Sequence, residues 1–224
     1  MKKIHIFISQ HKYFYLLLLL IPLQIWFQYL ELTLIPQYMT QTQFDRKIPF
    51  IKEFVIPYLT WFVFVPYGVI YVGLHSKRDF YKLFVFLFGG MAVANLMFTL
   101  FPNAQDLRPV LHSTDPFSLL VKGIYMIDPP TNVCPSLHVI DSIAANTALQ
   151  HSEAFSSKKY GRAVSSSITV LICLSTVLIK QHAIFDVICG IIVAAFFYLA
   201  LYRLPFSHFR ETYAQNSSIS GRAT

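Results

Sequence analysis

Two histidines and one carboxylate in the second half of the chain have the spacing and type needed for nucleophilic or acid–base chemistry. His182 and Asp186 are four residues apart, so on a helix they share a face, one turn from each other. Asp186 would then accept a hydrogen bond from one ring nitrogen of His182 and leave the other nitrogen free to react. His138 supplies a second histidine, and Arg108-Pro109 supplies a fixed cation. Together these side chains are suited to phosphoryl transfer without a metal ion.

Both histidine segments lie at the ends of strongly apolar stretches, where an ionisable residue is costly unless it has a partner or a task. Two other interpretations of the same residues stay open. His182 and Asp186 can form a capping pair at the end of a helix. The two histidines and the carboxylate can also bind zinc or another divalent ion.

The composition indicates an integral membrane protein. The chain has 224 residues, of which 55% are hydrophobic and 13% are charged, whereas an ordinary soluble domain carries about a quarter charged residues. The formal charge of +7 does not indicate a nucleic-acid partner, because the basic residues are scattered between apolar segments. Cationic loops on the cytoplasmic side of a membrane explain this distribution better.

The fold predicted from hydropathy is all-α, a polytopic bundle of six transmembrane helices. A membrane-spanning helix needs about 20 mainly apolar residues; the fourth of the six segments is shorter and more polar than the others. The bundle forms one domain, residues 1–209, and residues 210–224 form a polar tail that we expect to be disordered. The six segments are Tyr13–Ile35, Phe54–Leu74, Phe80–Phe101, Pro135–Gln150, Ala163–Lys180 and Ala183–Leu204.

The distribution of lysine and arginine predicts the orientation in the membrane. If both termini are cytoplasmic, twelve of these residues fall in cytoplasmic segments and six fall outside, which agrees with the positive-inside rule. Arg108, His138, His182 and Asp186 then all lie on the non-cytoplasmic side. Short loops favour a bacterial plasma membrane.

Cysteine and aromatic residues are interpreted as structural. The three cysteines do not make a disulfide framework; two lie inside apolar segments, and Cys134 lies beside the segment that contains His138. Trp26, Trp61 and Tyr58 are expected to anchor the bundle or the membrane interface, and not to bind a cofactor.

The order of these motifs resembles the type 2 phosphatidic acid phosphatase superfamily. The matching parts are Arg108-Pro109, the segment Pro135-Ser136-Leu137-His138, and Ser175 followed by His182 and Asp186. The six predicted helices also match the membrane members of that superfamily. Asp45 with Ile48-Pro49-Phe50, and the segment Lys180-Gln181-His182, resemble the subgroup that includes inositol phosphorylceramide synthases.

The chain departs from the superfamily's pattern at three positions. Phe101 and Thr176 stand where the pattern has a lysine and an arginine, and Leu137 replaces a glycine. Two phosphate-binding cations are therefore missing from their usual places. Lys180 is the preferred substitute and Lys122 the second, although Lys180 can also extend to the membrane interface.

The resemblance implies a mechanism and a set of roles. His182 attacks phosphorus and forms a phosphohistidine, Asp186 holds its tautomer, and His138 protonates the leaving alkoxide. Arg108, Lys180, Ser136 and Pro109 form the substrate-binding set; Ser136 donates to phosphate or caps the fourth helix. No metal and no cofactor are required.

The function implied is a lipid phosphate phosphatase at the outer membrane face, with a lipid phosphate and the bilayer as partners. The alternative enzyme is a phosphotransferase that moves a phospho-head-group between lipids, and the alternative of another class is a non-catalytic lipid-phosphate binder or transporter. Phosphatidic acid, phosphatidylglycerophosphate and an isoprenyl pyrophosphate all fit as substrates, and the sequence leaves the lipid and the oligomeric state open.

Overall fold

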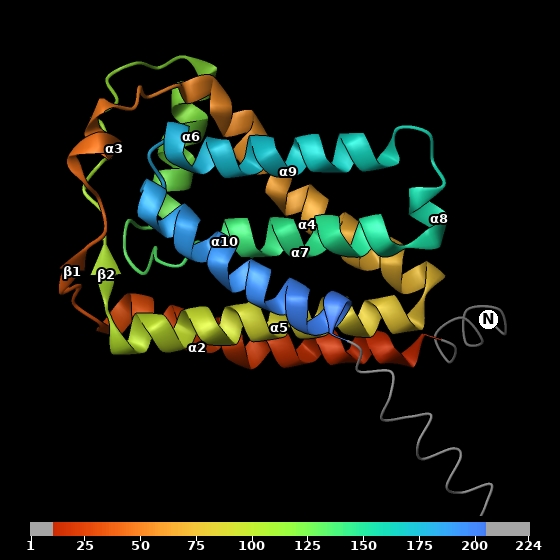
Figure 1. Cartoon of the computed structure of the whole chain (residues 1–224). Coiled ribbons are helices and arrows are strands. Elements are labelled where there is room, and N and C mark those ends of the chain that lie inside the picture. The colour runs from red at the N-terminus through yellow and green to blue at the C-terminus, as the bar shows by residue number, and fades with distance from the viewer. Residues whose placement is uncertain (1–10, 205–224) are drawn as a thin grey trace, which may run out of the picture.

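The protein is a mostly helical bundle whose long helices run side by side between two ends (Figure 1). The structure is a computed structural model and describes residues 11–204. The predicted tail, residues 210–224, and the end of the predicted domain lie outside the described residues. The helical segments are η1 Lys12–Leu19, α2 Leu20–Thr33, α3 Gln43–Lys47, η2 Lys52–Phe54, α4 Val55–His75, α5 Lys77–Leu100, α6 Pro116–Ile127, α7 Leu137–His151, α8 Glu153–Ser156, α9 Gly161–Leu178, α10 Ile184–Tyr198 and η3 Leu199–Arg203, and the strands are β1 Tyr38–Met39 and β2 Asn103–Ala104.

Five helical segments are long and apolar enough to cross a membrane. Their ends lie within three residues of the bounds predicted from hydropathy. This agreement is expected, because segment length and apolar content are local properties of the sequence. The five segments are Lys12–Thr33, Lys52–His75, Lys77–Leu100, Gly161–Leu178 and Ile184–Arg203.

The predicted count of six membrane spans is not confirmed, because α7 is too short to qualify. It has 15 residues and is therefore about 22 Å long, against about 30 Å of bilayer hydrocarbon. Yet α7 is the central helix, since it packs against α4, α5, α9 and α10. Ala144, Ala145 and Ala148 on α7 are fully buried, and their small side chains let the surrounding helices approach closely.

The outer surface of the bundle is apolar. Large hydrophobic side chains on several helices are half or more exposed, including Ile70 on α4, Leu96 on α5, Val170 on α9 and Phe196 on α10. A soluble monomer rarely exposes so continuous an apolar surface. With the five long apolar helices, this surface indicates an integral membrane protein.

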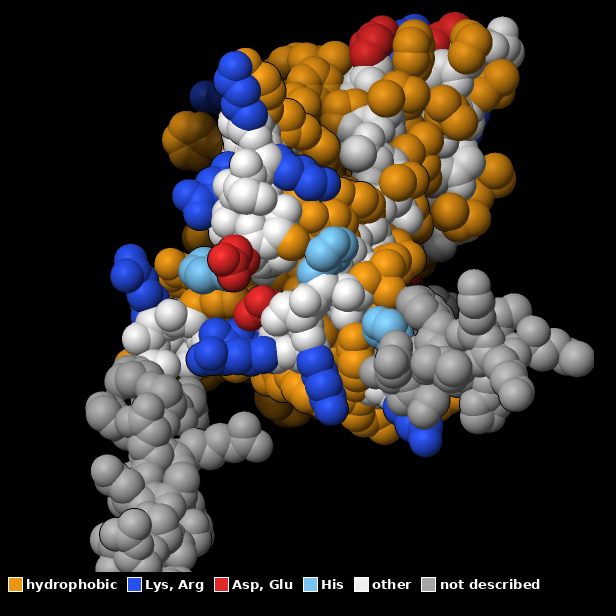
Figure 2. Space-filling view, turned by 90° about the vertical axis from the view of Figure 1, so that its right-hand side faces the viewer, with side chains coloured by type: hydrophobic (Ala, Val, Ile, Leu, Met, Phe, Trp, Pro, Cys, Tyr) orange, Lys and Arg blue, Asp and Glu red, His pale blue; other side chains and the backbone are white. Residues whose placement is uncertain are grey.

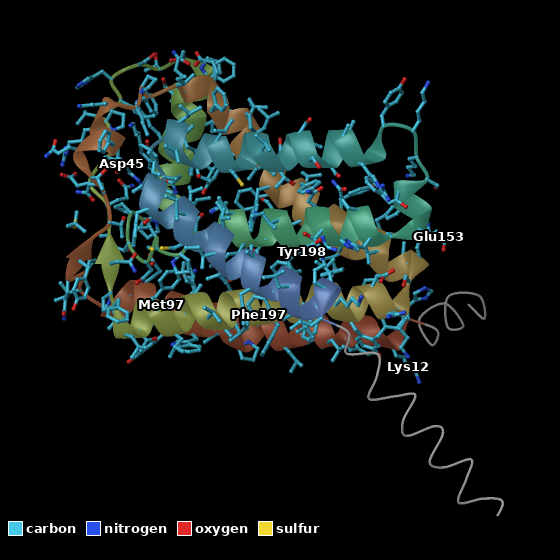
Figure 3. The ribbon with its side chains drawn as sticks, in the orientation of Figure 1. Lys12, Asp45, Met97, Glu153, Phe197 and Tyr198 are labelled. Carbon is cyan, nitrogen blue, oxygen red and sulfur yellow. The ribbon has the colours of Figure 1, made fainter. Side chains whose placement is uncertain are left out.

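One end of the bundle carries the irregular segments. The short helix α3, the paired strands β1 and β2, and the helix α6 gather there with the first turns of α7 and α10, and α8 lies at the other end (Figure 1). Asp45 marks the first end, and Lys12 and Glu153 mark the second (Figure 3). The helix α6 was not predicted. The sequence feature that could have predicted this helix is Asp115, a residue type that often precedes a helix. Its side chain accepts hydrogen bonds from the N–H groups of Phe117 and Ser118.

Candidate active site

His182 lies just before α10, and its ring faces the carboxylate of Asp186. The Nδ1 atom of His182 is 3.5 Å from Oδ2 of Asp186. This distance suits an ion pair and is longer than an ordinary hydrogen bond, and such contacts often tighten only when substrate binds. Oδ2 of Asp186 also accepts a hydrogen bond of 2.9 Å from the N–H of Ala183, so the carboxylate caps α10. Both side chains are almost completely buried.

The sequence argument that placed both residues on one helix was wrong in detail. The helix α10 begins at Ile184, so Asp186 lies in its first turn and His182 lies two residues before it. A tight turn after α9 sets the position of the histidine. Lys180 adopts a left-handed φ of 59° there, and the carbonyl of Thr176 accepts from the N–H groups of both Gln181 and His182. This arrangement resembles the usual end of a helix, although glycine is the common residue at such a position.

His138 lies in the first turn of α7 and meets His182 from the other side. Its Nδ1 atom is 3.5 Å from Nε2 of His182. The rings of Tyr58 and Trp61, both on α4, lie against the His138 ring at centroid distances of 4.6 and 4.7 Å. These aromatic residues were predicted only as anchors of the bundle or interface, and their contact with His138 follows from how α4 packs against α7.

A small cavity of about 40 Å³ opens beside the two histidines. Its wall includes apolar side chains and several groups that donate or accept hydrogen bonds. Such a mixture suits a site that orients one polar group of a mainly apolar ligand. The lining residues are Phe27, Asp128, Thr131, Asn132, Val133, Leu137, His138, Gln181 and His182.

Ser136 connects the starts of α7 and α10. Its N–H donates to the carbonyl of Asp186 at 3.1 Å. Its hydroxyl makes no capping hydrogen bond to α7, so the capping role that we considered for Ser136 is not what the structure shows. Oγ of Ser136 is buried and has no hydrogen-bond partner within residues 11–204. Ser136 is not among the residues that line the cavity, and a buried hydroxyl without a partner is uncommon in proteins.

Arg108 is joined to the histidine segment through Gln181. Its guanidinium donates to Oε1 of Gln181 at 2.6 Å and to the carbonyls of Tyr125 and Asp128. It also stacks on the Tyr125 ring, 4.3 Å from the ring centroid. Burial lowers the pKa of Arg108, and the negative charge of Asp128 acts against this shift. Arg108 itself is not among the residues that line the cavity.

Asp128 was not singled out in the sequence, but it lines the cavity next to the histidines. Its Oδ2 atom accepts hydrogen bonds of 2.7 Å from both the Tyr58 hydroxyl and Nε2 of Gln181. Gln181 therefore bridges Asp128 and Arg108 with the two ends of its amide. No sequence spacing indicates this network, because its members come from α4, the loop after α6 and the turn before α10.

Lys180 binds the segment around α3. Its ammonium donates to the carbonyls of Asp45 and Ile48, both at 2.7 Å. Burial lowers the pKa of Lys180, and Asp45 acts in the opposite direction. Oδ1 of Asp45 in turn accepts from the N–H of Ile184 at 2.7 Å, at the start of α10. Phosphate binding by Lys180 thus stays a prediction, and in this structure the ammonium holds a loop against the turn that carries His182.

The other predicted binding residues lie further from the histidines. The ammonium of Lys122 donates to the carbonyl of Ser113 on the surface of α6. Pro109 is partly buried and follows Arg108 in the loop before α6. Thr176, which replaces a cation of the superfamily's pattern, uses its hydroxyl to bond the Cys173 carbonyl within α9.

Two buried amides, Asn103 and Gln105, hold the loops of the site together. Oδ1 of Asn103 accepts from the N–H groups of Val133 and Cys134, and Nδ2 donates to the Cys134 carbonyl. Nε2 of Gln105 donates to the carbonyl of Lys180 at 2.9 Å. The sequence pattern that could have indicated both amides is the presence of polar residues directly after a predicted membrane helix.

Cys134 is buried beside the Asp186 carboxylate. Burial raises the pKa of the Cys134 thiol, and the charge of Asp186 adds to this shift. A neutral thiol is a poor nucleophile, so Cys134 acts as a packing residue next to the candidate dyad.

Comparison with known proteins identifies no relative. No protein-family model matches the chain, and no curated protein or solved structure gives a match. Within residues 11–204, no group of three or more His, Cys, Asp or Glu side chains is arranged to hold a metal ion.

Proposed function

We propose that this protein is a metal-independent lipid phosphate phosphatase that acts through a phosphohistidine at His182. The observation that carries the proposal is the position of His182 between Asp186 and His138. Its Nδ1 faces the carboxylate and its Nε2 faces the second histidine, at 3.5 Å in each case. This is the arrangement of an oriented nucleophile next to an acid–base group. The resemblance of the motifs that contain these residues to the type 2 phosphatidic acid phosphatase superfamily adds support.

The proposed reaction has two steps. The lone pair on Nε2 of neutral His182 forms a bond to phosphorus, the P–O ester bond breaks, and the leaving oxygen takes a proton from His138. Asp186 stabilises the positive imidazole ring during this step. Water then attacks phosphorus, gives its proton to His138, and releases inorganic phosphate together with neutral His182.

Several groups near the histidines are suited to bind the phosphate. The hydroxyl of Ser136 has no hydrogen-bond partner among residues 11–204, and the cavity wall includes the amides of Asn132 and Gln181. Arg108 does not line the cavity itself. Its guanidinium contacts the cavity wall through Gln181, because it donates a hydrogen bond to the side-chain oxygen of that residue. A shift of the Gln181 amide on substrate binding would free a guanidinium N–H for a phosphate oxygen, which is a strong charge-assisted contact.

A phosphotransferase is the second candidate. In this case Nε2 of His182 displaces one alcohol of a phosphodiester lipid, which takes a proton from His138, and the phospho-head-group stays bonded to Nε2. A lipid hydroxyl, instead of water, then attacks phosphorus, gives its proton to His138 and takes the phospho-head-group. The observation in its favour is the pair Asp128 and Asn132 in the cavity wall, since a carboxylate and an amide are suited to hold a hydroxyl group. The products distinguish the two candidates.

We also propose that the end of the bundle with His138 and His182 faces the non-cytoplasmic side of a plasma membrane. The short loops favour a bacterial membrane. Lys and Arg side chains gather on the opposite end (Figure 2), as the positive-inside rule requires of a cytoplasmic face. The α7 helix would then be the sixth, shortened span, enclosed by four of the other five. Labelling of single cysteines introduced at Lys122 and Lys159 by a membrane-impermeant reagent in intact cells tests this orientation. Labelling at Lys159 and not at Lys122 would reverse it.

The first experiment measures phosphate release from a panel of lipid phosphates in mixed micelles with a chelator present. Wild-type protein is expected to release phosphate, whereas His182→Ala is expected to be inactive while eluting as the same monodisperse species. The panel also includes phosphodiester lipids together with an acceptor lipid that has a free hydroxyl. New lipids that carry the head-group, without free phosphate, would establish the transferase. Equal activity of wild type and variant would refute the catalytic role of His182.

A further inference from the structure

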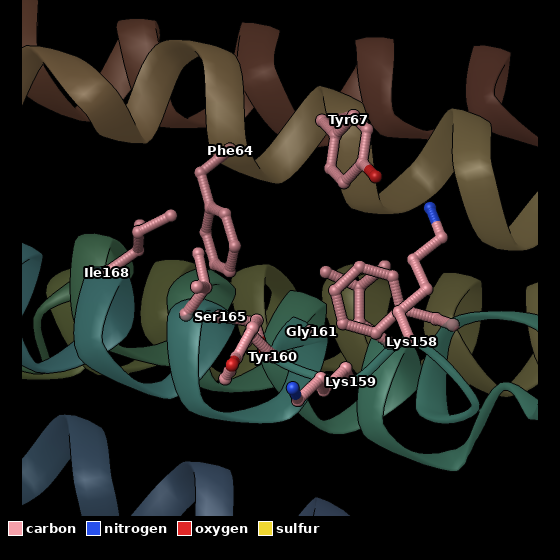
Figure 4. A pocket seen from close by; sticks show the side chains of 11 residues that line it. Phe64, Tyr67, Lys158, Lys159, Tyr160, Gly161, Ser165 and Ile168 are labelled. Carbon is pink, nitrogen blue, oxygen red and sulfur yellow. The ribbon is translucent and has the colours of Figure 1, made fainter.

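A second hollow lies at the opposite end of the bundle from the histidines, between α4, α7 and the segment that joins α8 to α9 (Figure 4). Its volume is about 510 Å³, against about 40 Å³ for the cavity beside His182. It is an open groove, so a long ligand can enter from the side of the bundle. The lining residues are Phe64, Tyr67, Leu149, Phe155, Lys158, Lys159, Tyr160, Gly161, Val164, Ser165 and Ile168.

The floor and walls of this groove are mainly apolar. Phe64 and Tyr67 project from α4 toward α9, and Ile168 on α9 closes the inner part (Figure 4). Val164, one turn before Ile168, is 53% exposed. Because α4 and α9 both qualify as membrane spans, the groove continues the apolar surface that faces lipid. It therefore suits a hydrocarbon chain.

Two lysines stand where the groove reaches the end of α9. The ammonium of Lys158 lies 4.6 Å from the centre of the Tyr71 ring, and that of Lys159 lies 5.1 Å from the centre of the Tyr160 ring. The ion pairs found within residues 11–204 all join other side chains, so neither lysine is neutralised by a carboxylate. Both ammonium groups remain available to an anion at the level of the lipid head-groups.

We propose that this groove binds an anionic glycerophospholipid of the surrounding leaflet, with an acyl chain along Phe64 and Val164 and the phosphate at Lys158 and Lys159. Apolar walls that end in two lysines without a carboxylate partner among residues 11–204 are complementary to such a lipid along its whole length. Basic pockets between membrane helices are known to hold anionic head-groups. The site is separate from the histidines and does not depend on the proposed phosphatase activity.

Native mass spectrometry of the full-length protein tests the proposal. The delipidated protein is equilibrated in detergent with equal amounts of phosphatidylglycerol and phosphatidylcholine that have the same acyl chains. Wild type is expected to retain phosphatidylglycerol with a preference of up to about 30-fold, the effect of two lysines near an anionic head-group. The double variant Lys158→Gln/Lys159→Gln is expected to lose that preference.

Two further variants separate a built site from general surface charge. Arg78→Gln/Lys82→Gln removes two charges from the same end of the bundle but outside the groove, and it is expected to keep the preference. Val164→Trp fills the groove without changing charge, at an exposed position that tolerates a larger side chain, and it is expected to lose bound lipid. Circular dichroism and size-exclusion profiles establish that each variant is folded.

The proposal is overturned by any of four results. The first is the absence of a preference in wild type, and the second is an unchanged preference in the Lys158→Gln/Lys159→Gln variant. The third is full lipid retention by Val164→Trp, which would assign the preference to surface charge. The fourth is a bound polypeptide in the groove instead of a lipid.

Discussion

Nε2 of His182 lies 3.5 Å from Nδ1 of His138, although the two residues are 44 positions apart in the chain. The contact depends on the packing of the first turn of α7 against the turn before α10. Hydrogen bonding between the Ser136 N–H and the Asp186 carbonyl fixes these two segments to each other. The proposed chemistry therefore depends on how closely the first turn of α7 packs against the turn before α10.

Loss of the proton donor is expected to depend on the leaving group. His138→Gln should lower kcat on an alkyl phosphate about 10²–10⁴-fold, the usual contribution of a general acid. With nitrophenyl phosphate the first turnover of the same variant should stay fast, because nitrophenolate leaves without protonation. The second step, in which His138 takes the proton from water, should be slowed for both substrates. Single-turnover kinetics on both substrates measure the first step alone. Equal losses in that step would show that His138 does not act as the acid.

Asp186→Asn is expected to lower kcat strongly while leaving the fold intact. The amide oxygen can still accept from the Ala183 N–H, but the neutral amide neither holds the reactive tautomer of His182 nor stabilises its positive charge. A loss of about 10²–10⁴-fold is expected by analogy with oriented histidines in hydrolases. Thermal unfolding of the same preparation serves as the control. An unchanged kcat would show that the Asp186 carboxylate serves only as a helix cap.

Lys180→Met is expected to destabilise the protein, and its effect on KM tests whether the ammonium also binds phosphate. The substitution leaves the carbonyls of Asp45 and Ile48 without their donor, at a cost of about 1–3 kcal/mol. The matched variant Lys122→Met removes an exposed contact and should alter stability by less than about 0.5 kcal/mol. Denaturant unfolding and steady-state kinetics are measured on both. A raised KM with unchanged stability would instead support phosphate binding by Lys180.

The contribution of Asp45 to stability is expected to disappear in acid. Burial by itself raises the pKa of a carboxyl, but the hydrogen bonds from Ile184 and Thr42 outweigh it, so the pKa of Asp45 lies below its ordinary value. A lowered folded-state pKa stabilises the protein above the unfolded-state pKa of about 3.9, and this stabilisation is lost as the pH falls through the folded-state value.

Unfolding of wild type and Asp45→Asn at about pH 7 and about pH 3 measures this effect. The variant should be about 1–3 kcal/mol less stable at the higher pH, because hydrogen bonds to a charged group are lost, and the difference should narrow at the lower pH. A difference that does not change with pH would show that the charge of Asp45 has no part in it.

Gly190→Ala is expected to lower both stability and activity. A Cβ atom there would lie 3.0 Å from the Ser136 carbonyl oxygen and 3.1 Å from Cβ of Val139, so the start of α7 and α10 would have to separate by a few tenths of an ångström. Overpacking of this kind costs about 1–3 kcal/mol, and the shift would separate Asp186 from the start of α7. The control is Gly123→Ala on α6, where a Cβ atom would meet nothing within 4 Å. This substitution should stabilise the protein by up to about 1 kcal/mol.

The sequence by itself determined the elements that depend on local composition. Five apolar segments of sufficient length are the five long helices, because apolar content over about 20 residues decides whether a helix can cross a bilayer. The sequence also drew attention to His138, His182 and Asp186, which the fold brings together. Their spacing carried this information, since a carboxylate in the first turn of a helix lies near the residues just before it.

The tertiary structure alone decided which side chains surround the histidines. Asp128, Tyr58 and Gln181 meet from segments more than 50 residues apart, and the partners of Lys180 are more than 130 positions away. Such contacts follow from how loops fold over the end of the bundle, and no local pattern encodes them. The central place of α7 has the same origin. Its polar residues lower its hydropathy, and only the packing of four other helices around it shows why a short helix is buried.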